Sequence, residues 1–269
     1  MLEGKYVRKA AGELDIAVER QMDSSMDGEI NTAFCFKSDT PWGKKRGAIR
    51  KKDPDAFSPT LRRYHKLLWS KPLPDGFPFK LVDTIPKSYL YHKSEKGEFW
   101  LSSDTVIPTF TREKKIRHVI EQIPPYDLDW FHAIGYTIGG MMVFPGQRMG
   151  GKMTINGARG FHPQIKDRFD LTVECIRLYY LREWSPLRDV LERYADFFDL
   201  FNDFSGYVKH FLLQDIVNDE CSEVKFFMPF DSFKTSPLPP SKDAYVLYMQ
   251  HALEFIEARN KRIREYCKA

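Results

Sequence analysis

Residues 88–106, SYLYHKSEKGEFWLSSDTV, decide the fold because they have the pattern of two short strands joined by a tight turn. The turn SEKGE between them favours antiparallel pairing of the two strands. FKLVDT, at 79–84, has the pattern of a third short strand directly before them. Together these segments predict a small, mostly antiparallel sheet in the first half of the chain.

The second half of the chain has helical spacing of its apolar residues. The segments expected to be helical there are 166–182, 186–201, 205–218 and 242–266. Strands gather in the first half and helices in the second, whereas repeated βαβ units would alternate them. The sequence therefore predicts an α+β fold, in which a mainly helical C-terminal half packs on the small sheet.

Other segments complete the expected secondary structure. Alternation around Phe34 and Phe36 predicts a strand over 32–38, and GMMVFPGQRMGGKMTIN, at 140–156, predicts a strand, a turn and a strand. TLRRYHKLLW, at 60–69, predicts a helix with a Ser-Pro entry that suits a cap and a first turn. We expect residues 1–30 to form an N-terminal helical extension and residues 31–269 a single α+β domain.

The composition of the 269 residues limits the class of protein. The 42% hydrophobic and 14% aromatic content is that of a globular chain, and the net charge of +4 does not require a polyanionic partner. No uninterrupted apolar run approaches the roughly 20 residues that span a bilayer. The N-terminus lacks an apolar signal core, and the four cysteines are far apart in the sequence. These features favour a cytoplasmic protein with free thiols and no membrane association.

A glycine-dense region is the first candidate for ligand binding. It holds eight of the 16 glycines between Gly135 and Gly160. Its polar candidates are Arg148, Lys152, Asn156 and Arg159. Backbone N–H groups, a helix N-terminus and guanidinium groups together suit a phosphate or another anion. The region matches no established phosphate-loop pattern, so a plain hairpin with glycine turns remains an alternative.

Carboxylates on the expected helix 166–182 form the second candidate. A narrow polar strip between two apolar stripes contains Asp167, Asp170, Glu174 and Arg177. Carboxylates in that setting need partners, and they could act as acid and base or bind a divalent metal. His132 is a candidate proton carrier beside them. The nearest partners in the sequence are Arg159, Arg168 and Arg177. The alternative is that Asp167 and Asp170 only cap the helix and that Glu174 forms an ion pair with Arg177 or Arg159.

The run GKKRGAIRKK, at 43–52, is the third candidate, as a loop that could contact a nucleic-acid backbone. Its basic residues are Lys44, Lys45, Arg46, Arg50, Lys51 and Lys52. Charge runs in loops are most often solvated surface, so that alternative remains as well.

Several stretches together resemble a known family. They include SPTLRRYHKLLWSKPLP, YLYHKSEKGEFWLSSDTVIPTF, YTIGGMMVFPG, DRFDLTVECIR and FIEARNKRI. They resemble a bacterial family that is catalogued as a domain of unknown function, over about 33 to 263. The resemblance implies one continuous domain, and it carries no activity and no residue roles. YLYHKS and GEFWLSSD are also similar to the strand segments of ADP-ribosyltransferases, whose histidine would correspond to His92.

These candidates give three hypotheses of function, and whether the protein is an enzyme stays undecided. The leading hypothesis is binding, extended to processing, of a phosphate-bearing ligand such as a nucleotide or nucleic acid, where the 139–160 loops meet the helix 166–182. The first alternative is a non-catalytic interaction protein, such as a stress or defence component, with an exposed apolar patch around Trp42, Trp69 or Trp184. The second is an ADP-ribosyltransferase-like enzyme. No cofactor is specified, and a divalent metal is the one candidate.

Overall fold

The predicted antiparallel sheet is present in the computed structural model, which describes residues 30–45, 48–83 and 89–268. Its strand order is β3-β4-β5-β6. The strands are β3 (Val82–Asp83), β4 (Leu90–Ser94), β5 (Gly97–Thr105) and β6 (Met141–Pro145). The tight turn between β4 and β5 places Ser94 opposite Gly97, where a φ of 137° suits glycine. Of the N-terminal extension expected over 1–30, residues 1–29 lie outside the described residues, as does Arg46.

The basic run forms a separate two-stranded hairpin, and the strand expected over 32–38 does not form. The hairpin consists of β1 (Trp42–Lys45) and β2 (Ala48–Lys51), so the expectation of a loop was wrong there. Residues 32–38 are turns, although Phe36 is buried as the pattern indicated. The Phe36 N–H donates one hydrogen bond, of 2.9 Å, to the Tyr136 carbonyl oxygen. Phe36 is therefore an anchor in a turn, and the alternation alone misled the prediction.

Helices in the first half surround the sheet and the following loops. They are α2 (Pro54–Phe57), α3 (Pro59–Trp69), α4 (Arg117–Ile120) and α5 (Pro125–Gly135), with short 3-10 turns η1 (Lys114–Ile116) and η2 (Ile138–Gly140). The entry predicted for α3 is confirmed, because the Ser58 hydroxyl accepts the Leu61 N–H at 3.1 Å and Pro59 starts the helix.

The second half is mainly helical, as predicted. Its elements are α6 (Ile155–Phe161), α7 (Phe169–Tyr180), α8 (Arg188–Glu192), α9 (Ala195–Asp199), α10 (Phe204–His210), η3 (Gln214–Ile216) and α11 (Lys242–Tyr266). The single helix expected over 186–201 is divided into α8 and α9. The second strand expected within 140–156 is wrong, since the Thr154 hydroxyl accepts the Gly157 N–H and thereby caps α6.

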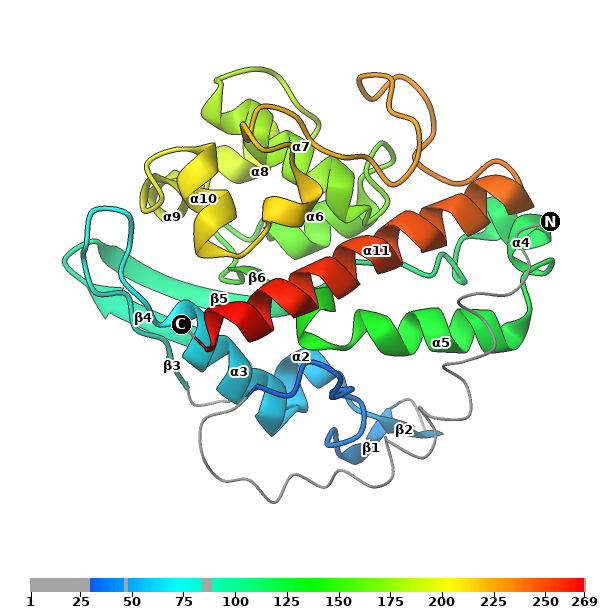
Figure 1. The fold of residues 1–269 in the computed structure, drawn as a ribbon, viewed down its shortest axis with the longest axis horizontal. Coiled ribbons are helices and arrows are strands. Elements are labelled where there is room, and N and C mark those ends of the chain that lie inside the picture. Colours follow the sequence, from blue (N-terminus) through cyan, green and yellow to red (C-terminus); the bar gives the residue numbers. More distant parts are fainter. Residues whose placement is uncertain (1–29, 46–47, 84–88, 269) are drawn as a thin grey trace.

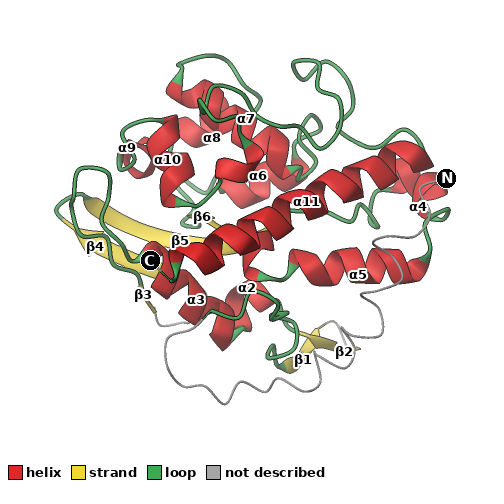
Figure 2. Cartoon of the chain, viewed as in Figure 1, coloured by secondary structure: helices red, strands yellow, loops and turns green. Residues whose placement is uncertain are grey.

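The long helix α11 runs across the molecule, between the upper group α6–α10 and the lower helices α3 and α5 (Figure 1 and Figure 2). It packs on α5, η2 and η3. Its Asn260 side chain accepts the Gly139 N–H at 2.8 Å, which ties α11 to the turn before β6. Buried side chains from both halves form one hydrophobic cluster. Among the described residues no helix combines the length and the apolar character that a bilayer crossing requires.

Candidate functional site

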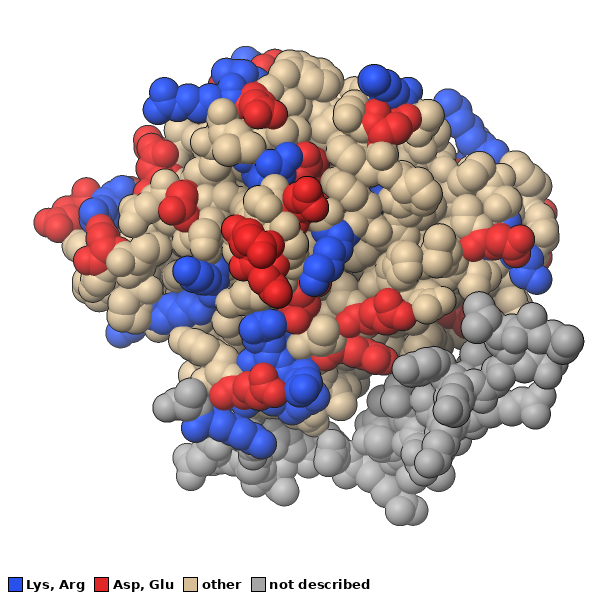
Figure 3. Space-filling view, turned by 45° about the horizontal axis from the view of Figure 1, so that its top comes forward, with Lys and Arg blue, Asp and Glu red and all other residues tan. Residues whose placement is uncertain are grey.

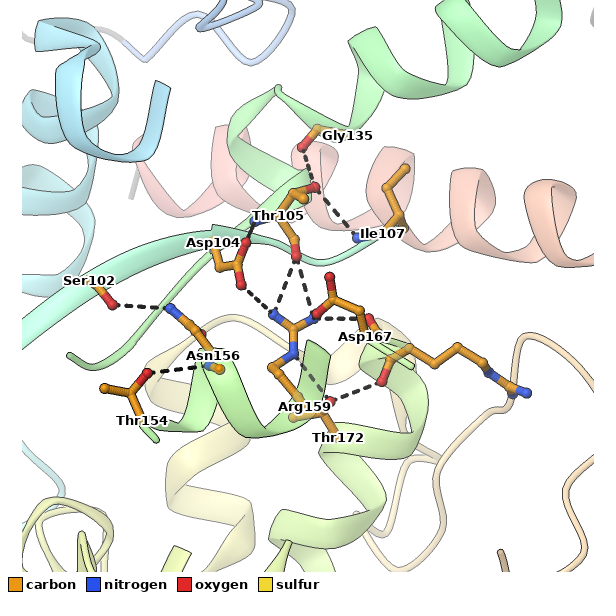
Figure 4. A network of polar contacts seen from close by, with 12 residues as sticks. Ser102, Asp104, Thr105, Ile107, Gly135, Thr154, Asn156, Arg159, Asp167 and Thr172 are labelled. Atoms are coloured by element: carbon orange, nitrogen blue, oxygen red, sulfur yellow. Dashed lines mark hydrogen bonds and ion pairs between the residues drawn. The ribbon is translucent and has the colours of Figure 1, made fainter. Parts of the chain in front are cut away.

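Arg159 lies at the centre of a polar network between β5, α6 and the start of α7 (Figure 4). Its Nη1 donates to Asp104 Oδ2 at 3.1 Å, and its Nη2 lies 3.2 Å from Asp167 Oδ1. Its other N–H groups reach the Thr105 and Asp167 carbonyl oxygens and the Thr172 hydroxyl. Because this guanidinium is fully buried and surrounded by partners, Arg159 holds two carboxylates together and presents no surface to a ligand.

Asp104 is a partly exposed member of this network, and its pKa lies near neutral pH. It follows Ser102 on one face of β5, because successive side chains on a strand point to opposite faces. Burial raises the pKa of the Asp104 carboxyl, Arg159 opposes that rise, and Asp167 adds to it, which leaves a pKa of about 7. A quarter of the side chain, 25%, remains exposed. Asp104 can therefore exchange a proton with solvent or a bound molecule.

The helix α2 packs against β5 and brings two more carboxylates to Asp104. Asp53 caps α2 by accepting the Asp55 N–H at 3.3 Å. Burial raises the pKa of the Asp55 carboxyl well above its usual range, and repulsion from Asp104 and Asp53 raises it further. Neighbouring carboxylates of this kind share protons, because ionising all of them at once is unfavourable.

A buried chain of hydrogen bonds reaches this group from α3. Trp69 Nε1–H donates to His65 Nδ1 at 2.9 Å, and because an indole nitrogen only donates, the ring proton of His65 must be on Nε2. His65 Nε2–H then donates to the Ser103 hydroxyl at 2.9 Å. Burial lowers the pKa of His65 to about 3, so the ring is neutral. The Ser103 hydroxyl in turn lowers the pKa of the Asp55 carboxyl, against the larger effect of burial.

The glycine-dense loop 146–153 is anchored at Ser102, on the same strand face as Asp104. At one end of the loop, a Cβ on Gly146 would lie 2.8 Å from Ser102 Oγ, so only glycine fits there. At the other end, Asn156 Nδ2 donates to Ser102 Oγ at 3.0 Å. Arg148 and Lys152, within the loop, are exposed. These two cations are therefore free to meet an anion, in contrast to Arg159.

Comparison with known proteins places the chain in a family. The model of a family of unknown function, DUF6994, matches residues 30–263. The chain belongs to the DUF6994 family. Every residue of the polar network around Arg159 and Asp104 lies within the matched residues 30–263. No curated protein and no solved structure matches the chain, so the evidence for a DUF6994 function comes from the site itself.

Two of the carboxylates predicted for catalysis are closed off in this DUF6994 chain. Asp170 is fully buried, where Arg168 Nε donates to its Oδ1 at 3.1 Å and the Phe227 N–H donates to its Oδ2 at 2.9 Å. Glu174 is also buried and accepts two 2.8 Å hydrogen bonds from Arg177. The ion-pair alternative describes both residues. Only Asp167, of the three predicted carboxylates, joins the network.

His132 lies beside the network without entering it. Lys37 Nζ donates to His132 Nδ1 at 2.8 Å, and burial together with this ammonium lowers the pKa of His132 to about 4. Tyr136, one turn later, contacts the His132 ring with 5.3 Å between centroids. Burial and the charges of Asp55, Asp53 and Asp104 raise the pKa of the Tyr136 hydroxyl. Tyr136 therefore stands between His132 and the carboxylates.

His92, the residue highlighted by the similarity to ADP-ribosyltransferases, is a packing residue in this DUF6994 chain. It is buried between Phe79 and Phe99, with 4.1 and 6.2 Å between ring centroids. Its Nε2 contacts the Ser94 hydroxyl at 2.8 Å. No open face of the ring is left for a nicotinamide, and the ADP-ribosyltransferase hypothesis gains no support from this geometry.

Two adjoining hollows, of about 370 and 290 Å³, lie away from the network, beside α9 and α10. None of the site residues predicted from the DUF6994 sequence lines them. Within the described ranges, no group of three His, Cys, Asp or Glu side chains is placed to hold a metal ion. Of the basic run, Lys44, Arg50, Lys51 and Lys52 are exposed on the β1–β2 hairpin.

Proposed function

We propose that this chain binds a phosphate-bearing ligand, a nucleotide or a nucleic acid, beside the end of β5, and that Asp104 transfers a proton during its processing. The observation that carries the proposal is the partly exposed Asp104 carboxyl with a pKa of about 7. A general acid or base works best when its pKa is close to the working pH, and it contributes about 10²- to 10⁴-fold in rate.

The surrounding residues set the charge of Asp104. Arg159 favours the ionised form, whereas burial and the neighbouring Asp167 favour the protonated form. Asp104 Oδ1 accepts the Thr105 N–H at 2.9 Å and Oδ2 accepts from Arg159, so both oxygens are fixed in orientation while keeping a free lone pair. In this proposal Asp104 holds the mobile proton, and Arg159 and Asp167 act as positioning residues.

The loop 146–153 supplies the positive charge that an anionic ligand needs beside so many carboxylates. Arg148 and Lys152 are exposed there, and Gly150 and Gly151 have φ values of 57° and 73°. Glycines let a ligand approach the backbone closely, and arginine suits phosphate oxygens. Carboxylates and phosphate can also be bridged by a divalent cation such as Mg²⁺. Mg²⁺ therefore belongs in the test.

Binding is tested by thermal denaturation with ATP, NAD, RNA and DNA, each with and without Mg²⁺. The variant Arg148→Gln/Lys152→Gln removes the loop cations, and Lys115→Gln/Arg117→Gln removes two exposed cations in η1 and α4 as the matched control. A ligand at about 100 times its Kd stabilises the native state by about 2.7 kcal/mol. That raises Tm by about 5 to 10 °C for a chain of this size. We expect this shift in the wild type and the control, and its loss in the loop variant.

Two results would refute the binding proposal: no shift of the wild type with any of these ligands, or an equal shift of the wild type and the loop variant with ATP or NAD. The proton-transfer half is tested separately, by following the bound ligand with ³¹P NMR. Asp104→Asn should leave the thermal shift in place and slow conversion by about 10²-fold or more. If the wild type binds a ligand and never converts any, the protein is a binding protein and Asp104 has no catalytic role.

A further inference from the structure

The β1–β2 hairpin presents large apolar side chains to solvent. Trp42 is 65% exposed and Ile49 is 68% exposed. In the antiparallel register Trp42 lies opposite Lys51, and Lys44 lies opposite Ile49. Residues directly opposite each other share a face, and so do residues two apart on one strand. Trp42, Lys44, Ile49 and Lys51 therefore form one surface, which we call the Trp42 face.

The Trp42 face is cationic as well as aromatic. The Lys51 ammonium lies 5.7 Å from the centre of the Trp42 ring and also donates to the Lys37 carbonyl oxygen. On the opposite face of the hairpin, the Lys52 side chain lies against Gly43, and its ammonium lies 4.4 Å from the ring centre of the exposed Phe57. Within the described ranges neither lysine forms an ion pair with a carboxylate. The charge on this hairpin is therefore available to a partner.

The other exposed tryptophan, Trp184, lacks this combination. Trp184 is 62% exposed, but its ring neighbour is Phe233, at 6.5 Å between centroids, and Glu183 precedes it in the chain. On the face shown in Figure 3, Lys and Arg are interspersed with Asp and Glu. The Trp42 face instead combines a flat exposed ring with lysines on the same side of a narrow ribbon.

We propose that the Trp42 face binds single-stranded nucleic acid, with a base stacked on Trp42 and the backbone phosphates beside Lys44 and Lys51. Exposed aromatic rings next to cations are the elements that bind single strands without sequence preference. A duplex keeps its bases stacked on one another, so only an unpaired base can cover the Trp42 ring. The inference is independent of the proposed function, because it uses neither Asp104 nor the loop 146–153.

A lipid surface is the competing partner for an exposed tryptophan next to lysines. Interfacial elements, however, bury a whole apolar helix face in the headgroup region. The Trp42 face has only two large apolar side chains, which is enough to stack a base. Charge complementarity then favours the nucleic acid, and anionic vesicles become an arm of the test.

The test is fluorescence anisotropy of the full chain with a labelled oligothymidylate of about 12 nucleotides, a length within the site sizes of single-strand binding folds. Trp42→Ala removes the ring, and Trp184→Ala removes an equally exposed ring as the matched control. Lys44→Gln/Lys51→Gln removes the lysines of the face, with Lys115→Gln/Arg117→Gln as its control. All four variants change exposed side chains, so circular dichroism and Tm should match those of the wild type.

We expect binding at low salt and an affinity about 10-fold or more weaker in Trp42→Ala. Trp184→Ala should bind like the wild type. Because single strands release about 0.7 counterion per neutralised phosphate, the lysine variant should lower the slope of log affinity against log salt by about 1.4. No binding at low salt, equal losses in the two tryptophan variants, or a Trp42-dependent preference for anionic phosphatidylserine vesicles over the oligonucleotide would overturn the proposal.

Discussion

Arg159 and Arg259 are both fully buried, and their partners differ in kind. Arg259, on α11, donates to the carbonyl oxygens of Gly139, Met141 and Phe211 at 2.9 to 3.0 Å. Arg159, on α6, also reaches two carbonyl oxygens, but it is paired in addition with the carboxylates of Asp104 and Asp167. Carbonyl oxygens do not titrate, whereas the pKa of the Asp104 carboxyl is about 7.

The difference separates a structural connection from a candidate site. Burial lowers the pKa of Arg259 to about 10, so it stays charged at neutral pH while it joins α11 to the sheet and to the end of α10. Arg159 is equally buried, but its two carboxylates are 25% and 29% exposed. A buried arginine that controls the charge of partly exposed carboxylates can influence chemistry at the surface. Four substitutions test this difference between Arg259 and Arg159.

Arg259→Met should produce the largest loss of stability. It leaves three buried carbonyl oxygens without donors, and each such group costs about 1 to 3 kcal/mol. We expect the free energy of unfolding to fall by about 4 kcal/mol or more, with a drop in Tm of about 10 °C. Urea denaturation should give the same loss at acidic and alkaline pH. A strongly pH-dependent loss would contradict the structural role of Arg259.

Arg159→Met should cost less and should depend on pH. At pH 8 the wild type holds the Asp104 carboxylate beside the Arg159 cation, and the variant, which lacks that cation, is less stable by about 3 kcal/mol. Below neutral pH Asp104 takes up a proton, since without Arg159 its pKa rises further above 7. We therefore expect the loss, measured by urea denaturation, to be about half as large near pH 5.5 as near pH 8. Equal losses at the two pH values would remove the distinction between the two arginines.

Asp104→Asn should change the pH dependence of stability in a direction that its raised pKa fixes. The native state holds the Asp104 proton more tightly than the unfolded state does, so the bound proton stabilises the wild type at low pH. This stabilisation is lost as pH rises from the usual carboxyl range to about 7. Asparagine does not ionise. The free energy of unfolding of the variant, measured relative to that of the wild type, should therefore rise by about 1 to 2 kcal/mol as pH goes from about 5 to 8, after allowance for solvent screening. The exposed Asp219→Asn is the control, and an equal gain in it would argue against the account.

Glu174→Gln should have the smallest effect. Arg177, its partner, is partly exposed, so the ion pair is screened by solvent. We expect the free energy of unfolding to fall by about 1 kcal/mol at low ionic strength. Molar salt should largely abolish this difference between the variant and the wild type. A larger loss than that of Arg159→Met would place the important ion pair on α7 and not on α6.

The sequence predicts those elements whose signals are local. The turn between β4 and β5 and the Ser58-Pro59 entry of α3 are correct because a few neighbouring residues determine each one. The strand expected over 32–38 fails because alternation around Phe36 says nothing about whether a partner strand exists. The basic run 43–52 forms a paired hairpin, although its high content of lysine and arginine favoured a loop.

The site could be predicted only in part, because contacts between segments that are far apart in the sequence have no local signal. Arg159, near the end of the segment 139–160, contacts Asp167 just before α7, where it is a buried ion-pair partner. Asp104 and Asp55 are absent from the prediction, because β5 and α2 bring them together only by packing. No spacing in the sequence links these two carboxylates, and only their shared environment raises their pKa values.

The titration of Asp104 at neutral pH can be measured directly. The side-chain carboxyl resonance of Asp104, assigned by its loss in Asp104→Asn, can be followed by ¹³C NMR across the pH range. We expect the midpoint of this titration at a pH of about 7. A midpoint close to the unperturbed aspartate value of about 3.9 would contradict it.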